Sequence, residues 1–125
     1  MKLVLAALAA AGAVTMAAAP PAARVAEGAR AFQKCYSCHS VKAGETGLSG
    51  PNLRGIVGRP IAAELGFDYS AALRRLGRRQ LRWTPARLDR FLADPEAFAP
   101  GTSMTFHMPS ACERADLIAW LGTRR

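Results

Sequence analysis

Hydrophobic residues recur at helical spacing in several stretches of the chain. In the first stretch they fall every three or four positions, at Val25, Ala29, Phe32 and Tyr36, which predicts an amphipathic helix that ends at a cysteine pair. The same spacing predicts helices over residues 69–77 and 84–93, and a last helix that begins near Cys112 or Glu113 and carries Leu117, Ile118, Trp120 and Leu121. No segment shows the period of two that marks a half-buried strand. The pattern therefore predicts an all-α domain.

Turn and capping residues mark the ends of these segments. Thr84 is a good N-cap and Pro85 a good first helical residue, and Pro95 is expected to end the helix that they begin. Residues 40–62 are rich in glycine and contain two prolines, which predicts an ordered loop. Since glycine lets a backbone come close to a neighbouring group, such a loop is suited to wrapping a cofactor.

Residues 1–19 differ in kind from the rest of the chain. Lys2 precedes an apolar run over residues 3–14, and three alanines stand before Pro20. This order is typical of a secretory signal peptide that is removed on export to the periplasm, and it leaves one domain over residues 20–125. An uncleaved membrane anchor is the alternative, although an alanine-rich run is only weakly hydrophobic.

The chain of 125 residues is strongly basic, with a formal net charge of +8. A basic exported protein is suited to an acidic partner, and the periplasm argues against nucleic acid. Much of the charge is crowded into one short segment that contains Arg74, Arg75, Arg78, Arg79 and Arg82. On a helix these side chains would lie mostly on one side, unless Gly77 breaks that helix. The cluster is either a solvated face or a docking patch.

The segment Cys35-Tyr36-Ser37-Cys38-His39 matches C-x-x-C-H, the signature of covalent haem attachment. On a helical turn the two cysteines point the same way and can form thioethers with the two vinyl groups of one porphyrin. His39 then offers its imidazole to the iron. A structural zinc site needs four ligands, and the chain has no second cysteine pair. A thioredoxin-type pair would follow a strand, and none is predicted. One covalent haem c is therefore expected.

A second stretch with metal-binding side chains is PGTSMTFHMP, at residues 100–109. Met104, His107 and Met108 can each bind a soft or borderline metal. They are packing residues, a copper-type cluster, or one half of a site that is completed upstream. Cys112, just beyond, is expected to stay a free thiol, with an intermolecular disulfide as the alternative.

Over residues 27–122 the chain resembles the class I cytochromes c of the soluble mitochondrial and alphaproteobacterial type. The resemblance is carried by EGARAFQKCYSCHS, GPNLRGIVGR, FDYSAAL, Trp83, LADPEAFAPGTSMTF and ERADLIAWL. It implies a small single-domain fold with about four to five helices and long loops wrapped around one haem. It also implies that Gly28 and Phe32 of the first helix pack against Leu117 and Trp120 of the last.

The resemblance also implies roles for residues around the haem. Met104 would be the sixth iron ligand, opposite His39, and the Pro51 carbonyl would accept a hydrogen bond from the other nitrogen of His39. Phe106 would shield the haem edge. The residues implied to hold a propionate are Arg59, Tyr69, Trp83 and Thr102.

Some positions depart from the family pattern. Phe91 stands where a tyrosine is often found, which removes a hydroxyl near the methionine sulfur. Lys34 is retained from the basic ring around the haem edge, but Glu96 and Ser103 occupy positions that are commonly lysine. That ring is therefore thin.

A haem iron bound by His39 and Met104 has no open position, so it can change oxidation state without binding a substrate. The resemblance therefore implies a monomeric periplasmic one-electron carrier and not an enzyme. Its expected partners have acidic docking surfaces, and are a cytochrome bc-type complex or dehydrogenase on one side and an oxidase, reductase or photosynthetic reaction centre on the other. Two alternatives stay open: a cytochrome subunit of a larger oxidoreductase, and a five-coordinate haem sensor or peroxidase-like protein.

Overall fold

The structure is a computed structural model that describes residues 12–13 and 22–125. The expected signal peptide over residues 1–19 lies almost entirely outside the described residues, so its cleavage stays a prediction. Within those described ranges, no helix has the length and apolar character that crossing a membrane requires.

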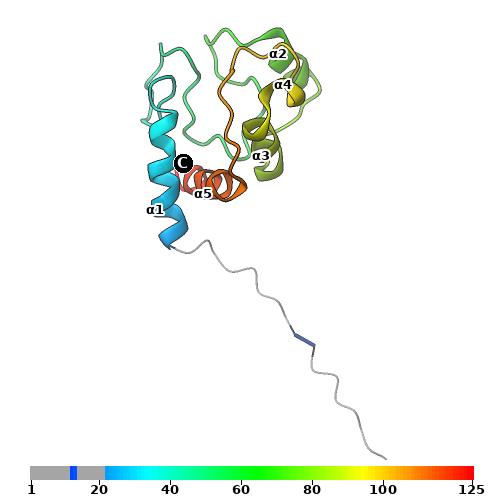
Figure 1. Ribbon diagram of the computed structural model, residues 1–125. Helices are drawn as coiled ribbons and strands as arrows, with labels where there is room; N and C mark the ends of the chain where they lie inside the picture. Colours follow the sequence, from blue (N-terminus) through cyan, green and yellow to red (C-terminus); the bar gives the residue numbers. More distant parts are fainter. Residues whose placement is uncertain (1–11, 14–21) are drawn as a thin grey trace, which may run out of the picture.

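The described part of the chain folds into five α-helices and one short 3-10 helix (Figure 1). They are α1 (Ala22–Ala31), η1 (Phe32–Lys34), α2 (Ala71–Arg78), α3 (Pro85–Ala93), α4 (Pro95–Phe98) and α5 (Ala111–Gly122). The same residues form no strand, only an isolated bridge between Pro60 and Arg82. The prediction of an all-α domain is confirmed, and residues 40–62 form a loop as expected.

The first helix is shorter than its apolar spacing predicted. α1 ends at Ala31 and the chain tightens into η1, which has three residues per turn. Side chains beyond Phe32 therefore rotate away from the apolar stripe of α1. Phe32 is 7% exposed, whereas Tyr36 is 61% exposed. The prediction that Tyr36 continues the packing face was wrong.

Side-chain caps set where the other helices begin. The hydroxyls of Ser70, Thr84 and Ser110 accept hydrogen bonds from backbone N–H groups in the first turns of α2, α3 and α5. Asp94 does the same for α4, accepting from the Ala97 N–H at 3.0 Å. Pro95 was predicted only to end α3. Because Pro95 follows a capping aspartate, it also begins α4.

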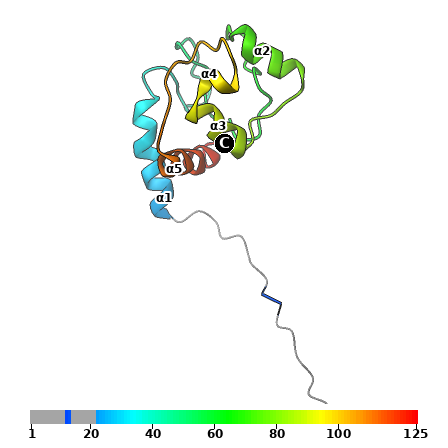
Figure 2. The same cartoon turned by 45° about the vertical axis from the view of Figure 1, so that its right-hand side comes forward.

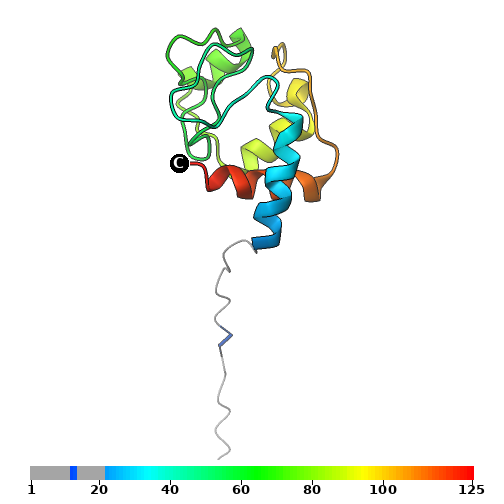
Figure 3. The ribbon, with the colours of Figure 1, turned by 90° about the vertical axis from the view of Figure 1, so that its left-hand side faces the viewer.

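α1 and α5 cross at close range at one end of the molecule (Figures 1 and 3). A Cβ added to Gly28 would lie 2.6 Å from the Trp120 Cβ and closer still to the Asp116 carbonyl oxygen. The Phe32 and Trp120 rings lie 4.9 Å apart, and Leu117 is 1% exposed. The implied packing of the first helix on the last is therefore present, and only glycine fits at the crossing.

α2 lies at the end of the molecule opposite this crossing (Figure 2). The helix predicted over residues 69–77 is present and continues through Gly77 to Arg78, so Gly77 does not break it. A Cβ at Gly77 would lie 2.6 Å from the Ile61 carbonyl oxygen. The glycine is thus explained by the close approach of the loop that contains Ile61, and not by a helix end.

Candidate functional site

Cys35 to His39 form one helical turn after η1. The N–H groups of Cys38 and His39 both donate to the Cys35 carbonyl, at 3.0 and 2.9 Å. Both cysteines are free thiols, Cys35 buried and Cys38 exposed. Burial, with a smaller contribution from Cys38, raises the pKa of Cys35 to about 11. Hydrogen bonds from Ser49 and Ser37 lower the pKa of Cys38. The pair is thus available to bond a cofactor.

The imidazole of His39 is held in one orientation. Its Nδ1 lies 2.7 Å from the Pro51 carbonyl oxygen, so the contact implied by the resemblance is present. Since a carbonyl can only accept, Nδ1 carries the proton and Nε2 keeps its lone pair. Burial lowers the pKa of His39, and this outweighs the opposing effect of the Pro51 hydrogen bond. His39 is therefore neutral at neutral pH, which is the form that binds a metal.

The glycine-rich loop presses its backbone against this imidazole. The Gly50 N–H donates to the Cys38 carbonyl at 2.8 Å. A Cβ at Gly50 would lie 2.6 Å from the His39 Nδ1, a distance that real Cβ atoms do not adopt. The loop thus leaves room for the ring and for nothing larger, as its glycine content predicted.

We expect Gly50→Ala to displace the His39 ring and to lower the free energy of unfolding of the haem-loaded protein by ~1–3 kcal/mol, the usual cost of overpacking. The measurement is urea unfolding followed by Soret absorbance. Gly122→Ala is the control, because a Cβ there meets nothing within 4 Å. Equal unfolding midpoints for the two variants would contradict the steric argument.

The segment that carries Met104 is fastened at both ends. At the start, the Gly101 N–H donates to both carboxylate oxygens of Glu96, at 3.0 and 3.1 Å. At the end, the Met108 N–H donates to the Leu92 carbonyl at 2.7 Å. Arg114 donates to the carbonyls of Met108 and Pro109 at 2.9 and 2.8 Å. Between these anchors Met104 is half-buried and packs against the core.

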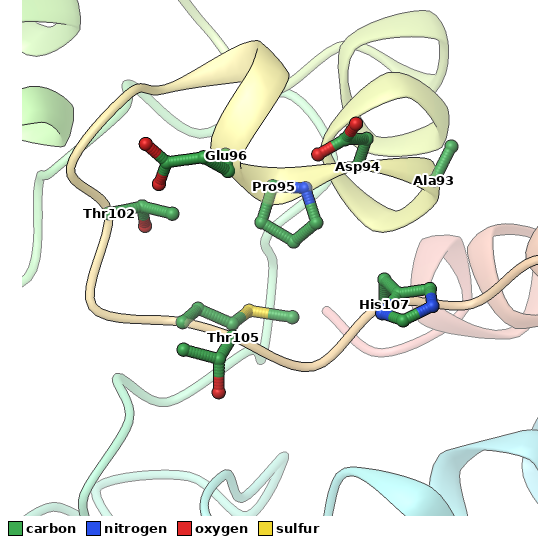
Figure 4. A pocket seen from close by; sticks show the side chains of 8 residues that line it. Ala93, Asp94, Pro95, Glu96, Thr102, Thr105 and His107 are labelled. Carbon is green, nitrogen blue, oxygen red and sulfur yellow. The ribbon is translucent and has the colours of Figure 1, made fainter.

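A cavity of about 320 Å³ lies beside this segment (Figure 4). It is lined by Ala93, Asp94, Pro95, Glu96, Thr102, Met104, Thr105 and His107. Figure 4 shows Glu96 and Thr102 at one end of it and His107 at the other. His107 is exposed, whereas Met108 is 1% exposed and belongs to the core. These two neighbours therefore lie in different surroundings, which argues against a copper-type cluster.

Three of the four residues implied to hold a propionate, Arg59, Tyr69 and Trp83, are linked by a chain of hydrogen bonds. Arg59 donates to the Asn52 carbonyl at 2.7 Å, and the Asn52 N–H donates to the Glu64 carboxylate at 3.0 Å. The Tyr69 hydroxyl accepts from the Glu64 N–H at 3.0 Å. Trp83 joins through its backbone N–H, which donates to the Arg59 carbonyl at 2.8 Å. The connecting residues Asn52 and Glu64 carry no local signal and were not predicted from the sequence.

Thr102 supplies a direct indication of a missing partner. Its Oγ1 is buried and has no hydrogen-bond partner among the described residues. A buried hydroxyl without a partner costs ~1–3 kcal/mol, and a propionate would satisfy it.

Phe106 and Cys112 lie at the surface, and Phe106 is 39% exposed.

The cytochrome c family model matches residues 25–125. The chain is 42% identical over 103 residues to a cytochrome c homolog from Bradyrhizobium diazoefficiens, and 42% identical over 99 residues to the c-type cytochrome cy of Rhodobacter capsulatus. These matches cover 81% and 77% of this chain but 54% and 47% of those proteins, so the chain spans about half their length.

The chain belongs to the cytochrome c family. It is also 39% identical over 98 residues to cytochrome c2 from Agrobacterium tumefaciens, with 78% of this chain and 88% of that protein covered. Among solved structures, cytochrome c2 from Rhodospirillum centenum matches with a TM-score of 0.76 and 33% identity, over 80% of this chain and 97% of that one.

Membership confirms the predicted fold and cofactor. The relatives are cytochrome c electron carriers, and the family holds haem c through cysteine thioethers, here from Cys35 and Cys38. The residues present fit this group. Both thiols are free, His39 is neutral, Gly50 leaves space for its ring, and the Thr102 hydroxyl lacks a partner.

Proposed function

We propose that this cytochrome c is a one-electron carrier in which His39 and Met104 would bind the haem iron. The observation that carries the proposal is the hydrogen bond that His39 Nδ1 donates to the Pro51 carbonyl. This bond fixes the orientation of the imidazole and leaves Nε2 free for a metal. When bound, the haem supplies a one-electron couple between Fe(II) and Fe(III), and a thioether ligand favours Fe(II).

The other residues of the site position and shield this group. A haem propionate in a poorly solvated place needs hydrogen-bond donors. We propose that four residues bind it: Arg59, Tyr69, Trp83 and Thr102. This role for Thr102 is supported by its unpaired hydroxyl. Phe106, at the surface, is proposed to cover a haem edge and limit access of water.

The proposed location is the periplasm, and the proposed state is a monomer. Export rests on the signal-like pattern of residues 1–19. Cytochromes c2 and a cytochrome cy are among the relatives, which supports electron transfer between redox partners. The partners that we propose are a cytochrome bc-type complex or dehydrogenase and a terminal acceptor.

Stopped-flow kinetics test the carrier function. The haem-loaded protein is mixed with purified cytochrome bc-type complex, oxidase or dehydrogenase at low and at high salt. We expect fast second-order electron exchange that salt slows, as for weak, electrostatically steered encounters. A rate no greater than that of free haem with every candidate would refute the proposal.

A further inference from the structure

Five arginines lie on or just after α2, at the end of the molecule opposite the α1–α5 crossing (Figures 1 and 3). The arginine patch consists of Arg74, Arg75, Arg78, Arg79 and Arg82, all of which are exposed. The inner side of α2 is occupied by the buried Ala72 and by Leu73 and Leu76, which pack against the core. The helix thus presents its cations to solvent.

Most of this charge is not neutralised. Arg74 pairs with Asp68 at 3.0 Å and Arg82 donates to the Gly58 carbonyl at 3.0 Å. No ion pair among the described residues involves Arg75, Arg78 or Arg79. Five arginines against one aspartate leave the patch with a net charge of +4.

The spacing of the arginines adds mutual repulsion. Arg75 lies three residues before Arg78 and four before Arg79, and like charges at these helical spacings destabilise a helix. An anionic surface bound to the patch would relieve this repulsion. The two propionates of a haem could offset at most two of the charges, so the patch stays positive in the haem-loaded protein.

The segment around Met104 carries little free positive charge. Residues 91–113 contain no lysine or arginine, and Arg114, which bonds the end of the segment, is paired with Asp89 at 2.8 Å. Asp94 and Glu96 are fixed there, since one caps α4 and the other anchors the Gly101 N–H. Lys34, the cation retained from the expected basic ring, pairs with Glu113. An acidic protein therefore finds little attraction at this segment.

We propose that the arginine patch is the surface on which an acidic redox-partner protein docks. The inference rests on the proposed carrier function and assigns its docking face. The patch is connected to the haem-site residues through Arg82. Arg82 directly precedes Trp83, and its backbone forms an isolated β-bridge with Pro60, which directly follows Arg59. Leu65 is 96% exposed and stands three residues before Asp68, the partner of Arg74, so an apolar side chain is also available to a partner.

Charge reversal tests the docking face. The patch variant is R75E/R78E/R79E, and its matched control is R30E/R54E/R125E, which changes the net charge equally. The control residues lie away from α2: Arg30 is on α1, and Arg54 precedes Gly55, whose N–H donates to the Arg124 carbonyl beside the C-terminus. A milder variant, R75Q/R78Q/R79Q, guards against misfolding, which circular dichroism and the Soret band report.

The first probe is a polyglutamate peptide, titrated into the haem-loaded protein at ~0.01 M and ~0.15 M ionic strength. We expect the patch variant to lose at least roughly tenfold in affinity at low salt, and the control less than about threefold, because short-range complementarity counts for more than net charge. Equal losses in the two variants would overturn the proposal.

The second probe is electron exchange with the bc-type complex or oxidase. If the wild-type protein exchanges electrons but the patch variants react as fast as the control, the docking proposal fails and the carrier function stands. If no partner reacts, the carrier function fails, while the peptide titration still reports on the patch. Binding to phosphatidylglycerol–phosphatidylcholine vesicles that exceeds binding to the acidic peptide would assign the patch to a lipid surface and overturn the proposal.

Discussion

Replacing Met104 by alanine is expected to open the sixth coordination position of the haem iron and to lower its reduction potential. The thioether favours Fe(II), and the water that replaces it is a harder ligand that favours Fe(III). We expect a fall on the order of 100 mV or more, well within the ≈ 0.8 V that axial ligands span. The measurements are redox titration and loss of the methionine-to-iron charge-transfer band of the ferric protein.

His107→Ala and Met108→Leu are the matched controls for this substitution. Met108 is 1% exposed in the core, and His107 lies at the end of the cavity opposite Glu96 and Thr102, so both variants should keep the band. Persistence of the band in Met104→Ala would mean that another residue binds the iron. Rapid binding of carbon monoxide to the reduced wild-type protein at neutral pH would instead favour the five-coordinate sensor.

The haem side of the site could be predicted in detail because its signals are local. Cys35, Cys38 and His39 stand within five residues, and their spacing on one turn follows from helix geometry. The hydrogen bond from His39 to the Pro51 carbonyl was implied by the resemblance. It is present, with 2.7 Å between Nδ1 and the carbonyl oxygen. The glycine content of the following loop indicated a close approach, which Gly50 makes against the imidazole.

The anchors of the Met104 segment could not be predicted in this way. Glu96 was noted only as a departure from a common lysine, yet its carboxylate accepts from the Gly101 N–H. Arg114 lies six residues beyond Met108. Its guanidinium donates a hydrogen bond to the Met108 carbonyl and also forms an ion pair with Asp89 of α3. Such contacts join residues whose proximity depends on how the helices pack, and no local pattern of polar residues reveals them.

Helices were predicted well where caps and apolar spacing agree, as at Thr84 and Pro85. Local rules were less reliable at Gly77 and at Tyr36. Gly77 disfavours a helix by propensity, but the Ile61 carbonyl packs against it and α2 continues. Tyr36 has helical spacing, but the change to a 3-10 turn moves it to the surface.

Gly28→Ala is expected to cost at least ~3 kcal/mol of unfolding free energy, the upper end of the usual range for overpacking. The added Cβ would lie 2.7 Å from the Asp116 carbonyl carbon and 2.6 Å from the Trp120 Cβ. The first of these is backbone of α5, which cannot rotate away as a flexible side chain would. The two helices must therefore separate, and the contact between Phe32 and Trp120 is lost with them.

Guanidinium unfolding of the haem-loaded protein measures this cost, with Gly122→Ala as the control. Gly122 is also helical, but a Cβ there meets nothing within 4 Å. Its replacement should be neutral or should stabilise by up to ~1 kcal/mol, the gain in helix propensity from glycine to alanine. The two substitutions add the same methyl group to a helix, so a difference in sign between them isolates the crossing. A loss below ~1 kcal/mol for Gly28→Ala would mean that α1 and α5 can shift relative to each other, and the close crossing would then not be what holds these two helices together.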